Sequence, residues 1–156
     1  MAEWSLDLTE YAKKKNVEIK KVRKAYAFAL YSSIVKKTPV DTGRARGNWN
    51  VSVGQPDTTV SEKKLKQPMA KSSMPDVNGD ESIFISNNLP YITTLEYGGY
   101  PDPVKKGTWN KKKKQYEIRS QGGYSKHAPA GMVGVTLANN ENIFNAAVRS
   151  VEGESK

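Results

Sequence analysis

The stretch Thr38–Trp49 reads Thr-Pro-Val-Asp-Thr-Gly-Arg-Ala-Arg-Gly-Asn-Trp, and it separates a helical pattern from an alternating pattern. Pro39 cannot extend a helix, and it disfavours the helical conformation at the residue before it. The side chains of Asp41 and Thr42 can accept hydrogen bonds from backbone amides just ahead, and Gly43 can adopt positive φ without steric cost. From these residues alone, we expect a corner that joins a helix to a sheet.

The segment before the corner has the periodicity of an amphipathic helix that is rich in lysine. We expect this helix to run from Asn16 to Lys37 and to bury one stripe. A shorter helix is expected over residues 5–15, with Asp7 as its N-cap and Glu10 completing a near capping box. The apolar positions of the longer helix recur at three- and four-residue spacing, and they are Ile19, Val22, Tyr26, Ala29, Leu30 and Ile34.

Two strands are expected after the corner. Residues Ala45–Val53 alternate in polarity, which predicts a strand with Trp49 facing inward. Residues 54–80 are poor in large apolar side chains and predict a long polar loop, in which Thr58–Val60 is a candidate for strand pairing. Residues Ser82–Asn87 then predict a central strand.

A short helix and a second polar excursion follow. Tyr91–Tyr97 predicts one or two helical turns, with Pro90 at their start and Gly98 after their end. Residues 99–127 form the excursion, and they predict a β-hairpin whose tip is the run Lys111–Lys114. The aromatic residues that flank this run are Trp109 and Tyr116.

The last part of the chain predicts one helix from Pro129 to Val151, followed by a fraying tail at Glu152–Lys156. Gly131 and Gly134 are costly inside a helix, by up to about 1 kcal/mol each relative to Ala, so we expect another backbone to pack closely there. The candidate core residues of this helix are Met132, Val135, Leu137, Ile143, Phe144, Ala147 and Val148.

The length of 156 residues predicts one domain over residues 1–156, with a helical part (5–37), a strand-and-loop part (45–127) and a C-terminal helix (129–151). Hydrophobic residues make up 37% of the chain and its mean hydropathy is -0.70, which favours long polar loops or faces completed by partner chains. The expected fold class is α+β. A long N-terminal helix and a C-terminal helix would pack on a small antiparallel β-sheet, with two long polar loops.

Composition also bears on location. No apolar run approaches the ~20 residues that span a bilayer, and the N-terminus lacks the basic and apolar regions of a secretory signal. The chain has no cysteine, so disulfides and thiolate sites are excluded, which fits a reducing cytosol.

The net charge of +9 is unevenly distributed. Residues 13–37 hold nine Lys or Arg against Glu18, for +8, and residues 105–126 hold eight against Glu117, for +7. The remaining residues therefore sum to -6. The lysines of the first region fit a solvated helix face or a contact surface. Both positive regions suggest docking on something anionic, either nucleic acid or an acidic protein face.

The sequence contains no recognisable arrangement of catalytic residues, and we expect no enzymatic activity, no cofactor and no metal. His127 is the single histidine, and no His-Glu-x-x-His spacing or phosphate-binding Gly-x-x-x-x-Gly-Lys loop occurs. The triplet Asp41-Thr42-Gly43 occurs once, whereas an aspartic protease dyad needs two carboxylates that share a proton.

Three blocks of the chain, in one order, resemble the tail-completion or neck proteins of long-tailed bacteriophages. The first is Thr38–Arg44 followed by a Trp, the second is Ile85–Tyr91 followed by Leu95–Gly98, and the third is Ala128–Met132. Together with the N-terminal helix, the match spans about residues 4–150. The motif residues, expected to be folding determinants, are Thr38, Pro39, Asp41, Thr42, Gly43, Arg44, Trp49, Asn87, Pro90, Tyr91, Glu96, Gly98, Pro129 and Gly131.

This resemblance implies a non-enzymatic structural protein of the virion, assembled in the host cytoplasm. It also implies that the protein forms a ring at the head–tail junction, and six subunits are the expected number. There the ring would bridge head-closure or connector proteins and the tail terminator or tail tube, with contact to genomic DNA in its lumen as a further expectation. The long loops would carry most contacts to other proteins.

Two alternatives stay open at the level of sequence. A tail terminator protein is similar in size and position, and a basic nucleic-acid-binding module would use Lys111–Lys114 for phosphates with Trp109 and Tyr116 as stacking rings. No helix-turn-helix, zinc-finger or RNA-recognition signature supports the latter. Because the resemblance covers most of the chain, we expect the lysine run to meet an acidic protein surface rather than DNA.

Overall fold

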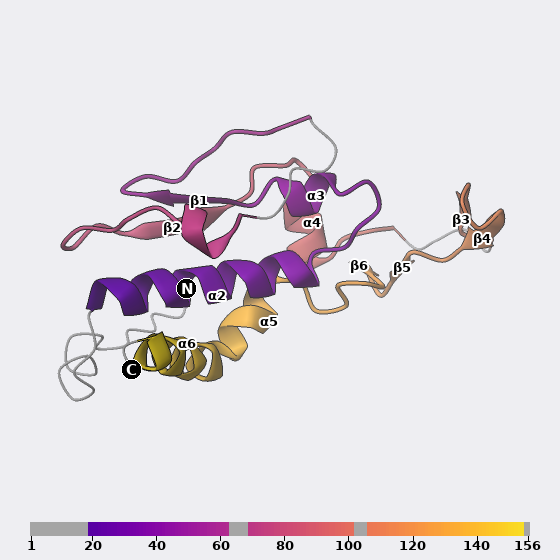
Figure 1. The fold of residues 1–156 in the computed structure, drawn as a ribbon. Helices are drawn as coiled ribbons and strands as arrows, with labels where there is room; N and C mark the ends of the chain where they lie inside the picture. The colour runs from indigo at the N-terminus through magenta and orange to yellow at the C-terminus, as the bar shows by residue number, and fades with distance from the viewer. Residues whose placement is uncertain (1–18, 63–68, 102–105, 155–156) are drawn as a thin grey trace.

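The computed structural model describes residues 19–62, 69–101 and 106–154, so the helix expected at 5–15 lies outside the described residues. The body has three layers (Figure 1). Strands β1 (Asn50–Val53) and β2 (Ile83–Ser86) lie on one side of helix α2 (Ile19–Lys37). Helices α5 (Val133–Ala138) and α6 (Asn140–Glu154) lie on the other. This arrangement confirms the predicted α+β class.

Helix α2 is the middle layer, and it is buried on two faces rather than along one stripe. One apolar cluster joins it to the sheet side of the molecule, and a second cluster joins it to α6. The expected stripe was too narrow. A helix that packs between two layers buries more than one face, so it needs apolar side chains at positions outside a single stripe as well. Ile19 is 39% exposed, whereas the buried residues that the stripe omitted are Ala25, Ala27, Tyr31 and Val35.

The corner after α2 contains a helical turn that the alternation did not predict. Gly43 adopts φ 83°, and α3 (Arg44–Gly47) follows it directly. The Gly47 amide donates to the Gly43 carbonyl at 2.9 Å, which closes the turn. The strand expected over Ala45–Val53 therefore starts only at Asn50, and Trp49 is buried in the core, as predicted, just before it.

The sheet of the body has two antiparallel strands, with Val51 opposite Ile85, so within the described residues β2 is not the central strand we expected. No strand forms at Thr58–Val60 either. Instead, the Asn50 side chain donates to the Thr59 carbonyl at 3.2 Å. Side-chain hydrogen bonds thus hold this segment, where a third strand would use a backbone ladder.

A side-chain amide strengthens this attachment. Asn48 is 2% exposed, and its side chain both donates to the Ser61 carbonyl at 3.0 Å and accepts from the Ser61 amide at 2.7 Å. The pairing mimics one rung of an antiparallel ladder.

The basic face of α2 contacts its own chain. Lys24 pairs with Asp76 at 3.3 Å, and Arg23 donates to the carbonyls of Gly79 and Glu81. Farther along the loop, 3₁₀ helix η1 (Lys71–Ser73) precedes two core residues, Met74 and Val77. The first positive region is therefore partly used inside the molecule rather than left wholly solvated.

Helix α4 (Ile92–Tyr97) confirms the short helix expected after Pro90. The C-terminal region forms two helices instead of one, which meet at Asn139. Its carbonyl accepts from the Ile143 amide at 3.2 Å, and its side chain accepts from Asn142 at 2.7 Å. The Asn139–Ile143 bond joins residues four apart, so the carbonyl of Asn139 is the acceptor with which α6 restarts, while its side chain binds another side chain rather than a backbone amide.

Some details of the expected C-terminal helix are wrong. Pro129 and Gly131 precede α5 rather than lying inside a helix, and α6 is still helical from Glu152 to Glu154, where fraying was expected. Of the candidate core residues, four are buried and Val135, Leu137 and Ile143 are only half-buried. The buried four are Met132, Phe144, Ala147 and Val148.

Two hairpins follow α4. The first, β3 (Thr108–Asn110) and β4 (Gln115–Glu117), lies away from the three layers (Figure 1) and confirms the predicted hairpin with a lysine tip. The second, β5 (Ser120–Gln121) and β6 (Tyr124–Ser125), turns through Gly122 and Gly123. In the part of the chain that the structure describes, no helix has the length and apolarity needed to cross a membrane.

Candidate interface and pocket

The corner is held by a hydrogen-bond network around Thr38. The Trp49 indole donates to Thr38 Oγ1 at 2.8 Å, and that hydroxyl donates to the Ile34 carbonyl at 2.8 Å. The Arg46 guanidinium donates to the carbonyls of Thr38 at 2.9 Å and Lys36 at 3.3 Å. A cation at the C-terminal carbonyls of a helix is electrostatically favourable, so Arg46 stabilises the end of α2.

Asn87 attaches the second motif block to α3, directly after the last residue of the run Thr38–Arg44. Its side-chain amide donates to the Ala45 carbonyl at 2.9 Å, and its side-chain oxygen accepts from the Leu89 amide at 3.1 Å. One side chain therefore fixes the end of β2 against α3 and starts the turn toward α4. Pro90 is exposed in that turn, directly before Tyr91.

The second block is also attached to the third, through Glu96. Its carboxylate accepts hydrogen bonds from the amides of Met132 at 2.8 Å, Val133 at 2.9 Å and Gly134 at 2.8 Å. These amides begin α5, where no helical carbonyl can reach them. Gly131 has φ 80°, and a Cβ there would lie 2.5 Å from the Glu96 carbonyl oxygen, which confirms the close backbone approach expected at this glycine.

Two other motif residues shape loops. Gly98 ends α4 with φ 83°, and a Cβ there would lie 3.1 Å from the ring of Tyr124. Pro129 is exposed and forms an isolated bridge with Gly131. Neither residue faces a ligand site in the described part of the chain.

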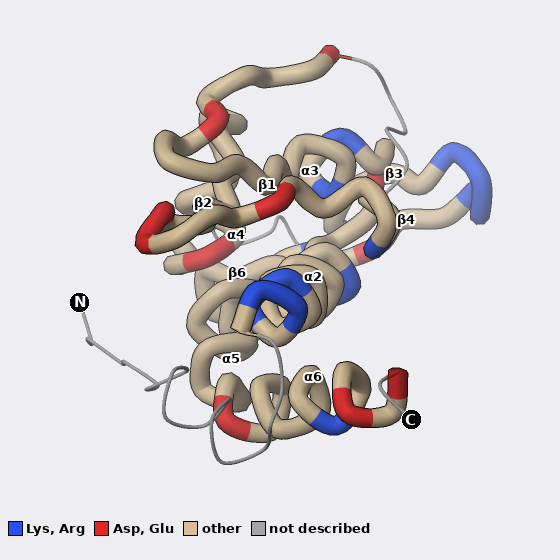
Figure 2. The backbone as a smooth tube through the Cα atoms, turned by 60° about the vertical axis from the view of Figure 1, so that its left-hand side comes forward, with Lys and Arg blue, Asp and Glu red and all other residues tan. Residues whose placement is uncertain are grey.

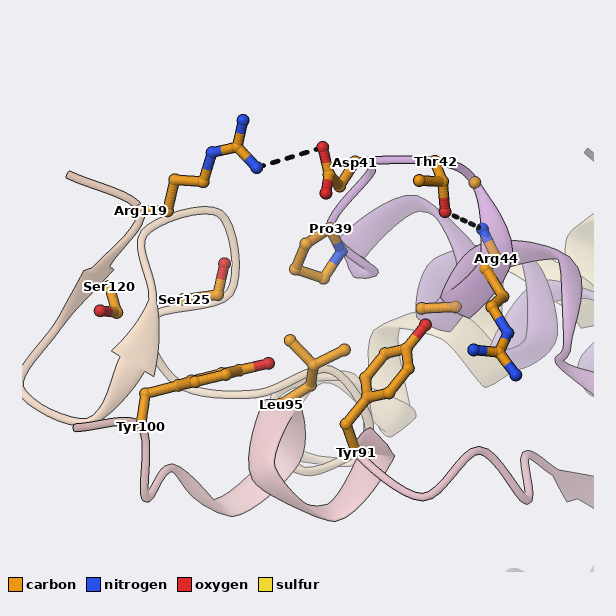
Figure 3. Close-up of a pocket in the computed structure, with 12 residues that line it drawn as sticks. Pro39, Asp41, Thr42, Arg44, Tyr91, Leu95, Tyr100, Arg119, Ser120 and Ser125 are labelled. Atoms are coloured by element: carbon orange, nitrogen blue, oxygen red, sulfur yellow. Dashed lines mark hydrogen bonds and ion pairs between the residues drawn. The ribbon is translucent and has the colours of Figure 1, made fainter. Parts of the chain in front are cut away.

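A cavity of about 300 Å³ lies where the corner meets α4 and the β5–β6 hairpin (Figure 3). Leu95 and Pro39 give it apolar walls, and the hydroxyl groups of Tyr91 and Tyr100 lie at it. Burial raises the pKa of Tyr91, an effect that the Arg44 guanidinium partly offsets. Burial also raises the pKa of Tyr100.

The rim of the cavity carries an ion pair. Asp41 was expected to bond to nearby amides, but its carboxylate pairs with Arg119 at 3.2 Å (Figure 3). Thr42 behaves as expected, since its hydroxyl accepts from the Arg44 amide at 3.3 Å. Arg44 itself pairs with Glu62 at 2.6 Å.

Sequence reasoning did not identify the other side of this cavity, which comprises Tyr100, Arg119, Ser120 and Ser125. The dipeptide Gly122-Gly123 between two short polar runs was the available signal. Both glycines have positive φ, 61° and 84°, which is the requirement of a tight two-residue hairpin.

The β3–β4 hairpin and its Lys111–Lys114 tip, here called the arm, are the candidate interface. Trp109 and Tyr116 are paired across the two strands, with ring centroids 5.1 Å apart, and they are 48% and 56% exposed. The side-chain oxygen of Asn110 accepts from the amides of Lys112 at 2.9 Å and Lys113 at 3.1 Å, so the tip is held in shape.

Residues 106–126 carry the whole net positive charge of the described chain. Residues 106–126 hold seven Lys or Arg and one acid, Glu117, whereas the other described residues hold ten basic and ten acidic side chains. Figure 2 shows the tip as a continuous basic turn. Lys113 pairs with Glu117 at 2.7 Å, and hydrogen bonds from Asn110 and Lys113 lower the pKa of Glu117.

No group of three or more His, Cys, Asp or Glu residues that could hold a metal ion occurs in the described residues. His127 is exposed, and its backbone amide donates to Ser125 Oγ at 3.3 Å. That hydrogen bond is made by the backbone of His127 and involves no imidazole nitrogen.

Comparison of the chain with models of protein families, with curated proteins and with solved structures yields no match.

Proposed function

We propose that this protein is a structural component of a tailed-phage virion, a tail-completion or neck protein that forms a ring at the head–tail junction. The observation that carries the proposal is the connection of the three motif blocks. Asn87 of the second block binds the backbone beside the first, and Glu96 of the second binds the backbone of the third.

This connection matters because the blocks are far apart in sequence. A chance resemblance has no reason to place its blocks side by side in the fold, yet side chains of the second block reach the backbone of Ala45, next to the first block, and of Met132, in the third, 42 and 36 positions away. Residues that fix a shared fold do have such a reason, since a buried or multiply bonded side chain is costly to replace. The contacts therefore support the resemblance, and with it a role in assembly.

The arm supports a role in assembly independently. A two-stranded hairpin has little stability of its own, and this one carries two half-exposed aromatic rings away from the body. Exposed Trp and Tyr side chains are enriched at protein interfaces. In a ring, one such heterologous contact would repeat around the axis. The role is one of interface geometry, without bond-making chemistry.

Joining of heads to tails tests the proposal. Particles of the phage that encodes the chain would be prepared without it, and the purified protein would then be added. We expect joined particles to form only after addition, with His127→Ala as a control that joins equally well. Heads and tails that join without the protein would contradict the proposal. Tails of irregular length in its absence would instead favour the tail terminator alternative.

A further inference from the structure

We propose that the arm binds the phosphate backbone of duplex DNA without sequence preference. This activity does not depend on the proposed assembly role, because it would be a property of the isolated chain. Two features of the arm carry it: lysines without acidic partners among the described residues, and a shape that fits a DNA groove.

The lysines of the tip are exposed, and most of them have no acidic partner among the described residues. Lys111, Lys112 and Lys114 are exposed and have no acidic partner among the described residues, whereas Lys113 pairs with Glu117. Lys114 adopts φ 51°, which tightens the turn, and Asn110 fixes the turn from inside. Several cations are thus clustered before any ligand arrives, so less ordering entropy is lost on binding.

The shape of the arm matches a groove of the duplex. The major groove of B-DNA, about 12 Å wide, admits a two-stranded β-ribbon. A ribbon of this kind with lysines at its tip can reach phosphates on both sides. The tip offers lysine, a point charge, rather than arginine with its bidentate fork, so phosphate contact without base reading is expected.

Charge alone does not select the partner of the arm. The described residues outside α2 and 106–126 hold ten acidic against four basic side chains, so an acidic protein surface, including one on another copy of the chain, is the alternative that the test below must separate from DNA. An acidic partner protein was the expectation from sequence. We choose DNA over that partner because the major groove of B-DNA admits a two-stranded β-ribbon, and the arm is a two-stranded antiparallel ribbon with a basic tip.

The test is a titration of a fluorescent duplex with the full chain, followed by anisotropy between about 50 mM and 200 mM salt. The double variant Lys111→Gln/Lys112→Gln keeps the Lys113–Glu117 pair. The matched control, Lys36→Gln/Arg149→Gln, removes two exposed charges from the body. The parent is expected to bind two unrelated duplex sequences with the same affinity.

We expect the tip variant to bind more weakly and to lose about 1.8 from the slope of log K against log salt, at about 0.9 per phosphate contact. The control is expected to match the parent. No binding at the lowest salt, or equal weakening in both variants, would overturn the proposal. Absence of binding would point to an acidic protein partner, and ring formation measured on the same variants would show whether assembly is affected separately.

Discussion

The hydroxyl of Thr38 joins the end of α2 to Trp49, since it donates to the Ile34 carbonyl and accepts from the indole N–H, each at 2.8 Å. Both side chains are buried, with Thr38 at 1% and Trp49 at 7% exposure. One hydroxyl therefore satisfies a helix carbonyl and an indole donor that would otherwise lack partners inside the core. This contact sets the direction in which the chain leaves the helix.

Replacing Thr38 with Val keeps the shape of the side chain but leaves the Trp49 indole without its acceptor. We expect the variant to lose about 1–3 kcal/mol of the free energy of unfolding, the cost of an unsatisfied buried donor. Urea denaturation followed by tryptophan fluorescence measures this loss. Thr58→Val, at an exposed position, serves as the control and is expected to change the midpoint little.

Gly43 is predicted to resist substitution because its φ is 83°. Gly43→Ala should destabilise by about 1–2 kcal/mol, and the β-branched Gly43→Val by more. Gly153 provides the opposite case, since it lies in α6 and a Cβ added there would meet nothing within 4 Å. Gly153→Ala should be neutral or stabilising by up to about 1 kcal/mol. Equal melting temperatures for Gly43→Ala and Gly153→Ala would disprove the argument.

Glu96 is expected to contribute more to the free energy of unfolding than an ordinary surface carboxylate, because it accepts three backbone hydrogen bonds at the start of α5. In Glu96→Gln, one acceptor oxygen becomes an NH₂ donor that faces backbone N–H groups. The predicted cost is about 1–3 kcal/mol, with faster hydrogen exchange at Met132–Gly134. Asp80→Asn, at an exposed loop position, is the control and should leave both readouts unchanged.

We predict that ionisation of Tyr26 lowers the free energy of unfolding at alkaline pH. Burial raises its pKa from 10.0 to about 12, so the folded state favours the neutral phenol. Its contribution is fully present below pH 10.0 and is lost as the pH rises toward about 12. Urea midpoints of the parent and of Tyr26→Phe, measured across this interval, check the prediction. The parent should lose more stability than the variant, and parallel curves would refute the assignment.

The local features of this fold could be predicted from sequence. Proline and glycine chemistry located the corner at Pro39–Gly43, helical periodicity located α2, and the run Lys111–Lys114 located a hairpin tip. Each of these signals acts over a few neighbouring residues. They therefore need no knowledge of what the rest of the chain does.

The errors arose where a distant partner or a single capping residue decides the structure. Alternation predicted a strand from Ala45, but Gly43 and the amide of Gly47 form a helical turn first. Apolar periodicity predicted one helix through Asn139, where the structure divides it into α5 and α6. Side-chain hydrogen bonds from Asn48 and Asn50 attach residues 59–61. Such contacts produce no periodic pattern of apolar residues, so nothing in the sequence indicated them.

The candidate site shows the same division. The arm and its aromatic pair were predicted as a unit, because a hairpin brings residues together over a short distance. The cavity was not, since it needs the corner to meet Tyr100 and Arg119 from a polar excursion. Only a three-dimensional contact such as Asp41–Arg119 reveals that meeting.

The mass of the particle in solution tests the central proposal most directly. Light scattering on the purified full chain, followed by electron microscopy of the same sample, measures both size and closure. We expect a closed ring, and six copies of 17.3 kDa would give about 104 kDa. A single species of 17.3 kDa over a wide range of protein concentration, with no rings in the images, would contradict the account.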